Sequence, residues 1–142
     1  MREPERDLGR LQDIIQAANN ILSFTDGHTR EQLSSDKLRY FAVVKNVEII
    51  GEAAYMLSLE FKEKHAHIPW NDIIRMRHVL VHGYATILPE LLWYTALVDV
   101  PILKEQIESG RRSGGCSAGC AAPALGSQVP GNPQEFFGFR TP

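Results

Sequence analysis

The sequence lacks the features of a secreted or membrane-bound protein. Its only cysteines, Cys116 and Cys120, lie together near the C-terminal end, so no disulfide framework can support the rest of the chain. No uninterrupted apolar run approaches the roughly 20 residues that span a bilayer. The opening segment, MREPERDLGR, lacks the apolar stretch of a secretory signal. We therefore expect a cytoplasmic protein with no membrane partner.

The sequence also has no large excess of charge of one sign and no strand-like alternation of apolar and polar residues. The formal net charge is −2, which gives no basis for a general nucleic-acid coat or a membrane-surface protein. A site that handles RNA would have to draw on locally placed Arg and Lys. No short stretch alternates apolar and polar residues with the β-branched enrichment of a strand. With 142 residues, the chain fits one ordinary domain, and we expect an all-α fold.

Helical periodicity is present instead. From Asp7 to Phe24 apolar residues recur at helical steps, and Asp26-Gly27 follows as a stop signal. Thr29 with Gln32 indicates a weak capping box that opens a short helical turn. The sequence thus predicts an amphipathic helix followed by a short second one.

A longer helix is predicted from about Asp36 to Lys62, with Gly51 in its middle. A mid-helix glycine costs about 1 kcal/mol relative to alanine. We therefore expect a close helix crossing at Gly51. The side chains expected on the inward face of this helix are Leu38, Phe41, Ala42, Val44, Ile49, Ala53, Met56 and Leu57.

Prolines mark the later helices. Pro69 suits the first turn of a helix that carries Trp70 to Val81, and Gly83 suits its C-cap. Pro89 opens the next helix, which Pro101 must kink or restart. The predicted architecture is an all-α bundle of about four or five helices.

The composition changes after Gly110, which sets the predicted domain boundary. Residues 1–110 form the helical domain. Residues 111–142 are rich in Gly and Pro and poor in large aliphatic side chains, so they cannot bury enough surface to offset the entropy of ordering. We expect a low-complexity, disordered tail. Its two cysteines have no further Cys or nearby His to complete a zinc set.

One short segment combines residues that could cleave a phosphodiester: Arg77, His82 and Tyr84. An imidazole can take a proton from a ribose 2′-hydroxyl or give one to the leaving oxygen. A guanidinium suits a phosphate that gains charge, and a phenol can donate a hydrogen bond or stack on a base. The spacing alone is a weak signal, because a histidine also suits a helix C-terminus and an arginine a solvated face. In an ideal helix His82 lies roughly 140° from Arg77.

A metal site is a weaker interpretation of the same segment. His78 and His82 have the i,i+4 spacing of a zinc pair. No Glu follows His78 directly, and no third ligand is evident, since His65 and His67 lie in the preceding loop. We predict no metal and no cofactor.

Three segments carry a family resemblance. They are AVVKNVEIIGEAAYMLSLEF (residues 42–61), IPWNDIIRMRHVLVHGY (residues 68–84) and LLWYTALVDVPILKEQI (residues 91–107). The first holds the motif N-x-E-x-I-G-E-A-A, and the second holds arginine, four residues, histidine, any residue and tyrosine. Together they closely resemble the HEPN superfamily, in particular its HepT-like toxins, over about residues 5 to 110.

The resemblance implies an α-helical, metal-independent ribonuclease that forms a homodimer with its two motif helices facing each other. It implies Arg77 and His82 as the catalytic pair. Many such toxins are encoded beside a minimal nucleotidyltransferase antitoxin that attaches AMP to the motif tyrosine, so Tyr84 becomes the expected modification site. Asn46 and Glu48 match the other family segment as supporting residues; the alternative is a buried polar network between helices.

One position departs from the family pattern. Asn often follows the motif arginine, and this chain has His78, which adds a titratable group and leaves the acid–base assignment open. The leading hypothesis is a toxin-type endoribonuclease that cleaves RNA, with tRNA as one candidate. The alternative is a non-catalytic helical module that binds a nucleotidyltransferase or a nucleotide.

Overall fold

The computed structural model describes residues 3–83 and 87–113, and over these residues it is helical with no strand. The all-α prediction is therefore confirmed. Tyr84 and residues 114–142 lie outside the described residues. No helix in the described part of the chain has both the length and the apolar character to cross a membrane.

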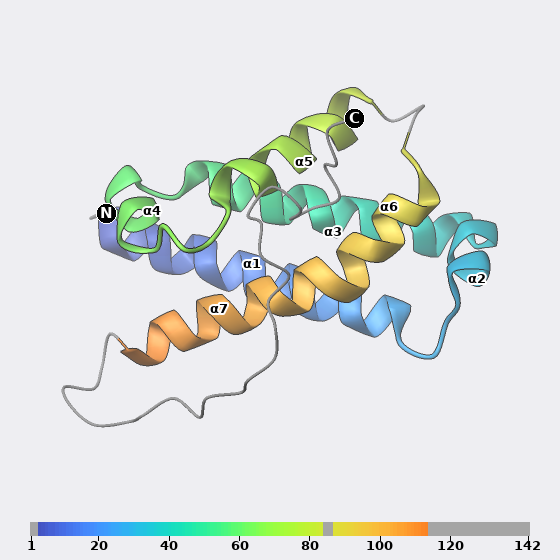
Figure 1. Ribbon diagram of the computed structural model, residues 1–142, viewed down its shortest axis with the longest axis horizontal. Coiled ribbons are helices and arrows are strands. Elements are labelled where there is room, and N and C mark those ends of the chain that lie inside the picture. The colour runs from blue at the N-terminus through green and yellow to red at the C-terminus, as the bar shows by residue number, and fades with distance from the viewer. Residues whose placement is uncertain (1–2, 84–86, 114–142) are drawn as a thin grey trace.

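Three long helices form the centre of the bundle (Figure 1). Helix α1 (Glu3–Thr25) runs along α3 (Lys37–Met56), and α5 (Trp70–His82) crosses the other side of α3. The core between them is aliphatic, with Ile14, Ile50 and Ile73 almost fully buried. The buried sides of α1 and α5 thus meet α3 from two directions.

Shorter helices connect and close the bundle. Helix α2 (Arg30–Ser35) opens with the predicted capping box: the Thr29 hydroxyl accepts from the Gln32 backbone N–H, and the Gln32 side chain accepts from the Thr29 N–H. Helix α6 (Pro89–Tyr94) begins at the predicted proline. A π-helical turn (Thr95–Asp99) joins α6 to α7 (Val100–Ser113), which packs beside α1.

The sequence predicts that Pro101 kinks or restarts the helix, and in the structure the helix widens into this π-helical turn just before the proline. Proline has no N–H to donate, and its ring crowds the turn before it. The wider turn at Thr95–Asp99 absorbs that distortion, and α7 continues directly from Val100. Helix α7 ends at Ser113, so the boundary predicted at Gly110 falls within its last turn.

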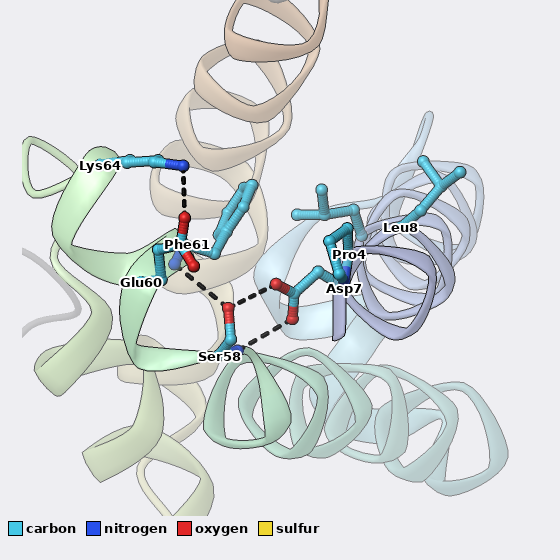
Figure 2. A pocket seen from close by; sticks show the side chains of 8 residues that line it. Pro4, Asp7, Leu8, Ser58, Glu60, Phe61 and Lys64 are labelled. Atoms are coloured by element: carbon cyan, nitrogen blue, oxygen red, sulfur yellow. Dashed lines mark hydrogen bonds and ion pairs between the residues drawn. The ribbon is translucent and has the colours of Figure 1, made fainter. Parts of the chain in front are cut away.

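The prediction of one continuous helix from Asp36 to Lys62 is wrong, because the helix is interrupted between Met56 and Leu59. Leu57 is extended, and Ser58 caps the separate helix α4 (Leu59–Lys64). The Asp7 carboxylate of α1 accepts hydrogen bonds from the Ser58 backbone N–H at 2.9 Å and from its hydroxyl at 2.5 Å (Figure 2). The helix break between Met56 and Leu59 is thus stabilised by Asp7, a residue far away in the sequence.

The predicted inward face of α3 is also wrong in part. Leu38, Phe41, Ile49 and Met56 are exposed, with 85%, 60%, 37% and 49% of their surface accessible. The buried residues of α3 are Val43, Val44, Asn46, Val47, Ile50, Gly51, Ala53 and Ala54, and Leu57 follows them. Apolar residues surround most of this helix, so its periodicity could not tell which stripe faces α1 and α5.

Candidate active site at the end of α5

Helix α5 presents one face to the core and the opposite face to solvent. Trp70, Ile73, Met76 and Leu80 are buried, whereas His78 and His82 are exposed. The helix ends where the predicted C-cap Gly83 donates its backbone N–H to the Val79 carbonyl at 2.7 Å. This ending places His82 in the last turn, on the surface.

Arg77 lies at the boundary between the buried and exposed faces and reaches toward α3. Its Nε is 2.6 Å from the Glu52 carboxylate, and its side chain is 34% exposed. The neighbouring Gly51 provides the close crossing that the sequence predicted, because a Cβ added there would overlap the Cβ of Arg77 and lie 3.2 Å from the Ile73 carbonyl oxygen. Arg77 therefore emerges from a tight α3–α5 contact.

His78 and His82 lie one turn apart on the exposed face of α5. Their ring centroids are 4.5 Å apart, and the ring planes are tilted by 53°. Both imidazoles are open to solvent, so both can exchange protons with water or with a bound ligand. Among the described residues, no group of three or more His, Cys, Asp or Glu side chains is arranged to hold a metal ion.

Arg77 and His82 point to different neighbours within one chain. Arg77 pairs with Glu52 on α3, whereas the His82 ring lies beside His78. This divergence agrees with the helical angle of roughly 140° between the two positions. Arg77 and His82 would have to converge to act on a single phosphate. A second copy of α5 facing the first would bring one arginine close to the other copy's histidine. Tyr84, the third motif residue, lies outside the described residues.

The two supporting residues of α3 have hydrogen-bond or ion-pair partners on α1 and α3. Asn46 is buried; its side chain donates to the Ala42 carbonyl at 2.8 Å and accepts from the Asn20 amide at 3.0 Å. Glu48 pairs with Lys45 at 3.3 Å. Asn46 thus forms the buried polar link between α1 and α3 that was the alternative interpretation.

Glu52 is the site residue that the sequence analysis missed. It lies in the family segment, but nothing local distinguishes it from other solvated helix carboxylates. The usable signal was Gly51: a glycine that marks a close crossing implies that the residue beside it lies close to the partner helix. Only the packing of α3 on α5 identifies that partner as Arg77.

The comparisons with known proteins agree with this geometry. A helical bundle with an arginine–histidine motif at the end of one long helix is the arrangement expected of a HEPN protein. Residues 14–109 match the family described as ribonuclease HepT-like. The chain belongs to this family and thus to the HEPN superfamily.

Three relatives illustrate the similarity. A protein of Thermococcus cleftensis named "Probable ribonuclease HepT" is 39% identical over 102 residues, which cover 72% of this chain and 93% of that protein. Two proteins with RNase names, from Methanocaldococcus jannaschii and Caldanaerobacter subterraneus, are each 35% identical over 98 residues. These cover 69% of this chain and 90% and 88% of the relatives. No solved structure gives a significant match.

Proposed function

We propose that this protein is a metal-independent endoribonuclease in which Arg77 and His82 act on the scissile phosphate. Family membership supports a ribonuclease function. The observation that carries the residue assignment is that Arg77 and His82 lie in the solvent-accessible last turns of α5, as a surface site for a long polymer requires.

The proposed reaction needs these groups, the RNA itself and a water molecule that takes the second proton-transfer role. The ribose 2′-oxygen attacks phosphorus and forms a new P–O bond, while its proton passes to a base. The bond from phosphorus to the 5′-oxygen breaks, and that oxygen takes up a proton. His82 serves as the base or the acid, and Arg77 stabilises the charge on the pentavalent phosphate. The products are a 2′,3′-cyclic phosphate and a 5′-hydroxyl, which balance without an oxidant or a metal.

We infer that the working form is a homodimer with a composite site. Arg77 and His82 diverge within one chain, so the arginine of one copy and the histidine of the other could meet across a two-fold axis. The exposed apolar side chains of α3, together with the exposed Val81 of α5, offer the surface that such a dimer would bury. Phe41, an aromatic side chain that is 60% exposed, is one of them.

Cleavage of RNA in the presence of EDTA tests the activity. Wild-type protein should cleave RNA, and His82→Ala and Arg77→Ala should not, while all three keep the same helical signal. His67→Ala is the matched control, because His67 is exposed and lies in the loop before α5. Absence of cleavage by unmodified wild-type protein would instead favour a non-catalytic module that binds a nucleotidyltransferase or a nucleotide.

We further propose a cytoplasmic toxin–antitoxin role in which a cognate nucleotidyltransferase attaches AMP to Tyr84. The support is the family resemblance and the position of Tyr84, two residues after His82. An added phosphate there would compete for Arg77, and the adenosine would occupy the RNA path. With ATP and Mg²⁺, the nucleotidyltransferase should add AMP mass to the Tyr84 peptide and abolish cleavage. Tyr84→Phe should escape this control; its modification and silencing at the wild-type rate would rule out Tyr84.

A further inference from the structure

The contact between α3 and α5 holds Arg77 at both ends of its side chain. At the root, the Cβ of Arg77 occupies the space that any side chain at position 51 would fill. At the tip, Nε lies 2.6 Å from the carboxylate of Glu52, the next residue of α3. Consecutive residues of α3 thus restrain the position of the arginine and the orientation of its guanidinium.

From this geometry we propose that Glu52 is a positioning residue that orients Arg77 for the phosphate before RNA binds. The proposal rests on the proposed ribonuclease function. The ion pair is made at Nε, so the terminal Nη nitrogens can donate to a second acceptor. The guanidinium can therefore hold Glu52 and contact a phosphate at the same time.

Pre-orientation outweighs the negative charge that Glu52 brings to the site. Its side chain is 50% exposed, so water and salt screen its repulsion of a phosphate bound at the far edge of the guanidinium. The contact of the carboxylate with Nε acts at short range and is weakened less by this screening. An arginine that is already oriented loses less side-chain entropy when the transition state forms. Because both side chains are partly exposed, the Arg77–Glu52 ion pair contributes little to the free energy of folding.

Steady-state cleavage by wild type, Glu52→Ala and Glu52→Gln tests the proposal. Glu52→Ala should lower kcat by about 10-fold or more with a smaller change in KM, since misplacing a catalytic group by about 1 Å can cost about 100-fold. Glu52→Gln should recover part of the loss, because its amide oxygen can lie beside Nε in place of the carboxylate.

Glu60→Gln is the matched control. Glu60 lies on α4, is exposed and pairs with Lys64 rather than with Arg77, so its kcat should stay within about 2-fold of wild type. Thermal melts should show all the variants equally folded. A Glu52→Ala enzyme as active as wild type, or more active, would overturn the proposal.

A readout without RNA separates this proposal from the proposed function. In NMR spectra the Nε–H of Arg77 should exchange slowly with water in wild type and rapidly in Glu52→Ala. Equal exchange in both proteins would overturn the pre-orientation. If the wild type cleaves no RNA but the exchange difference is present, the proposed function fails while the orientation of Arg77 by Glu52 stands.

Discussion

At the residue scale, Asn46 links two helices from inside the bundle. Its amide donates to the Ala42 carbonyl and accepts from Asn20, which in turn accepts from Gln16. These bonds run along the contact of α3 with α1, so the side chain joins helices rather than facing the exposed end of α5. Because Asn46 is buried, its loss would leave the Asn20 donor without its partner inside the protein.

We therefore expect Asn46→Ala to reduce the free energy of unfolding by about 1–3 kcal/mol. Cleavage activity per folded molecule should change little. Urea denaturation measures the first effect, and cleavage well below the unfolding midpoint measures the second. Asn19→Ala, an exposed position on α1, is the control and should change stability by no more than about 0.5 kcal/mol. Lost activity at unchanged stability would assign Asn46 to the chemistry instead.

At the scale of elements, the break between α3 and α4 depends on one carboxylate of α1. Asp7 is buried and accepts both the backbone N–H and the hydroxyl of Ser58. The same Ser58 hydroxyl accepts from the Phe61 N–H and so caps α4. Figure 2 shows the three groups converging between α1 and the start of α4. The turn that leads from α3 into α4, and onward to α5, is thus tied to the N-terminal helix.

Asp7→Ala should lower the free energy of unfolding by about 1–3 kcal/mol, because it leaves the part-buried Ser58 N–H without its acceptor. Asp13→Ala is the matched control on the same helix. Asp13 is half exposed and pairs with Arg10 at 3.7 Å, so its loss should cost no more than about 1 kcal/mol. Urea denaturation compares the two variants. Equal effects would mean that the Asp7–Ser58 contact does not stabilise the break.

At the scale of the whole molecule, the divergence of Arg77 and His82 predicts sharing of the active site between copies. A heterodimer of Arg77→Ala and His82→Ala chains would contain one composite site with both residues intact and one that lacks both. We expect such a purified heterodimer to recover about half of the wild-type activity, as a two-fold arrangement of composite sites requires. Each homodimeric variant should be inactive.

Cleavage assays on the doubly tagged heterodimer make this measurement. A heterodimer as inactive as its parents would show that each chain uses its own arginine and histidine.

Light scattering of the Phe41→Glu and Leu59→Glu variants tests the assembly itself. Both side chains are exposed, but only Phe41 lies on α3, so only its substitution should weaken the dimer.

Local signals in the sequence were sufficient to predict several helix ends and to identify the family. The Thr29–Gln32 capping box, the helix start at Pro89 and the helix end at Gly83 all occur where the sequence predicts them, because each depends on residues within one turn. The mid-helix Gly51 likewise indicated a close crossing. The motif of α5 and the segment around Asn46 were sufficient to identify a HEPN protein of the HepT-like type, which the family match confirms.

The tertiary structure alone decided which groups meet. The break at Ser58 depends on Asp7, 51 residues earlier, and Arg77 is oriented by Glu52 on another helix. The same holds for α3, whose exposed Leu38 and Phe41 could equally have faced inward on periodicity alone. Such contacts depend on how whole helices rotate and pack against one another. No pattern within a single helix contains that rotation, so the sequence indicated the candidate functional side chains and the packing set their partners.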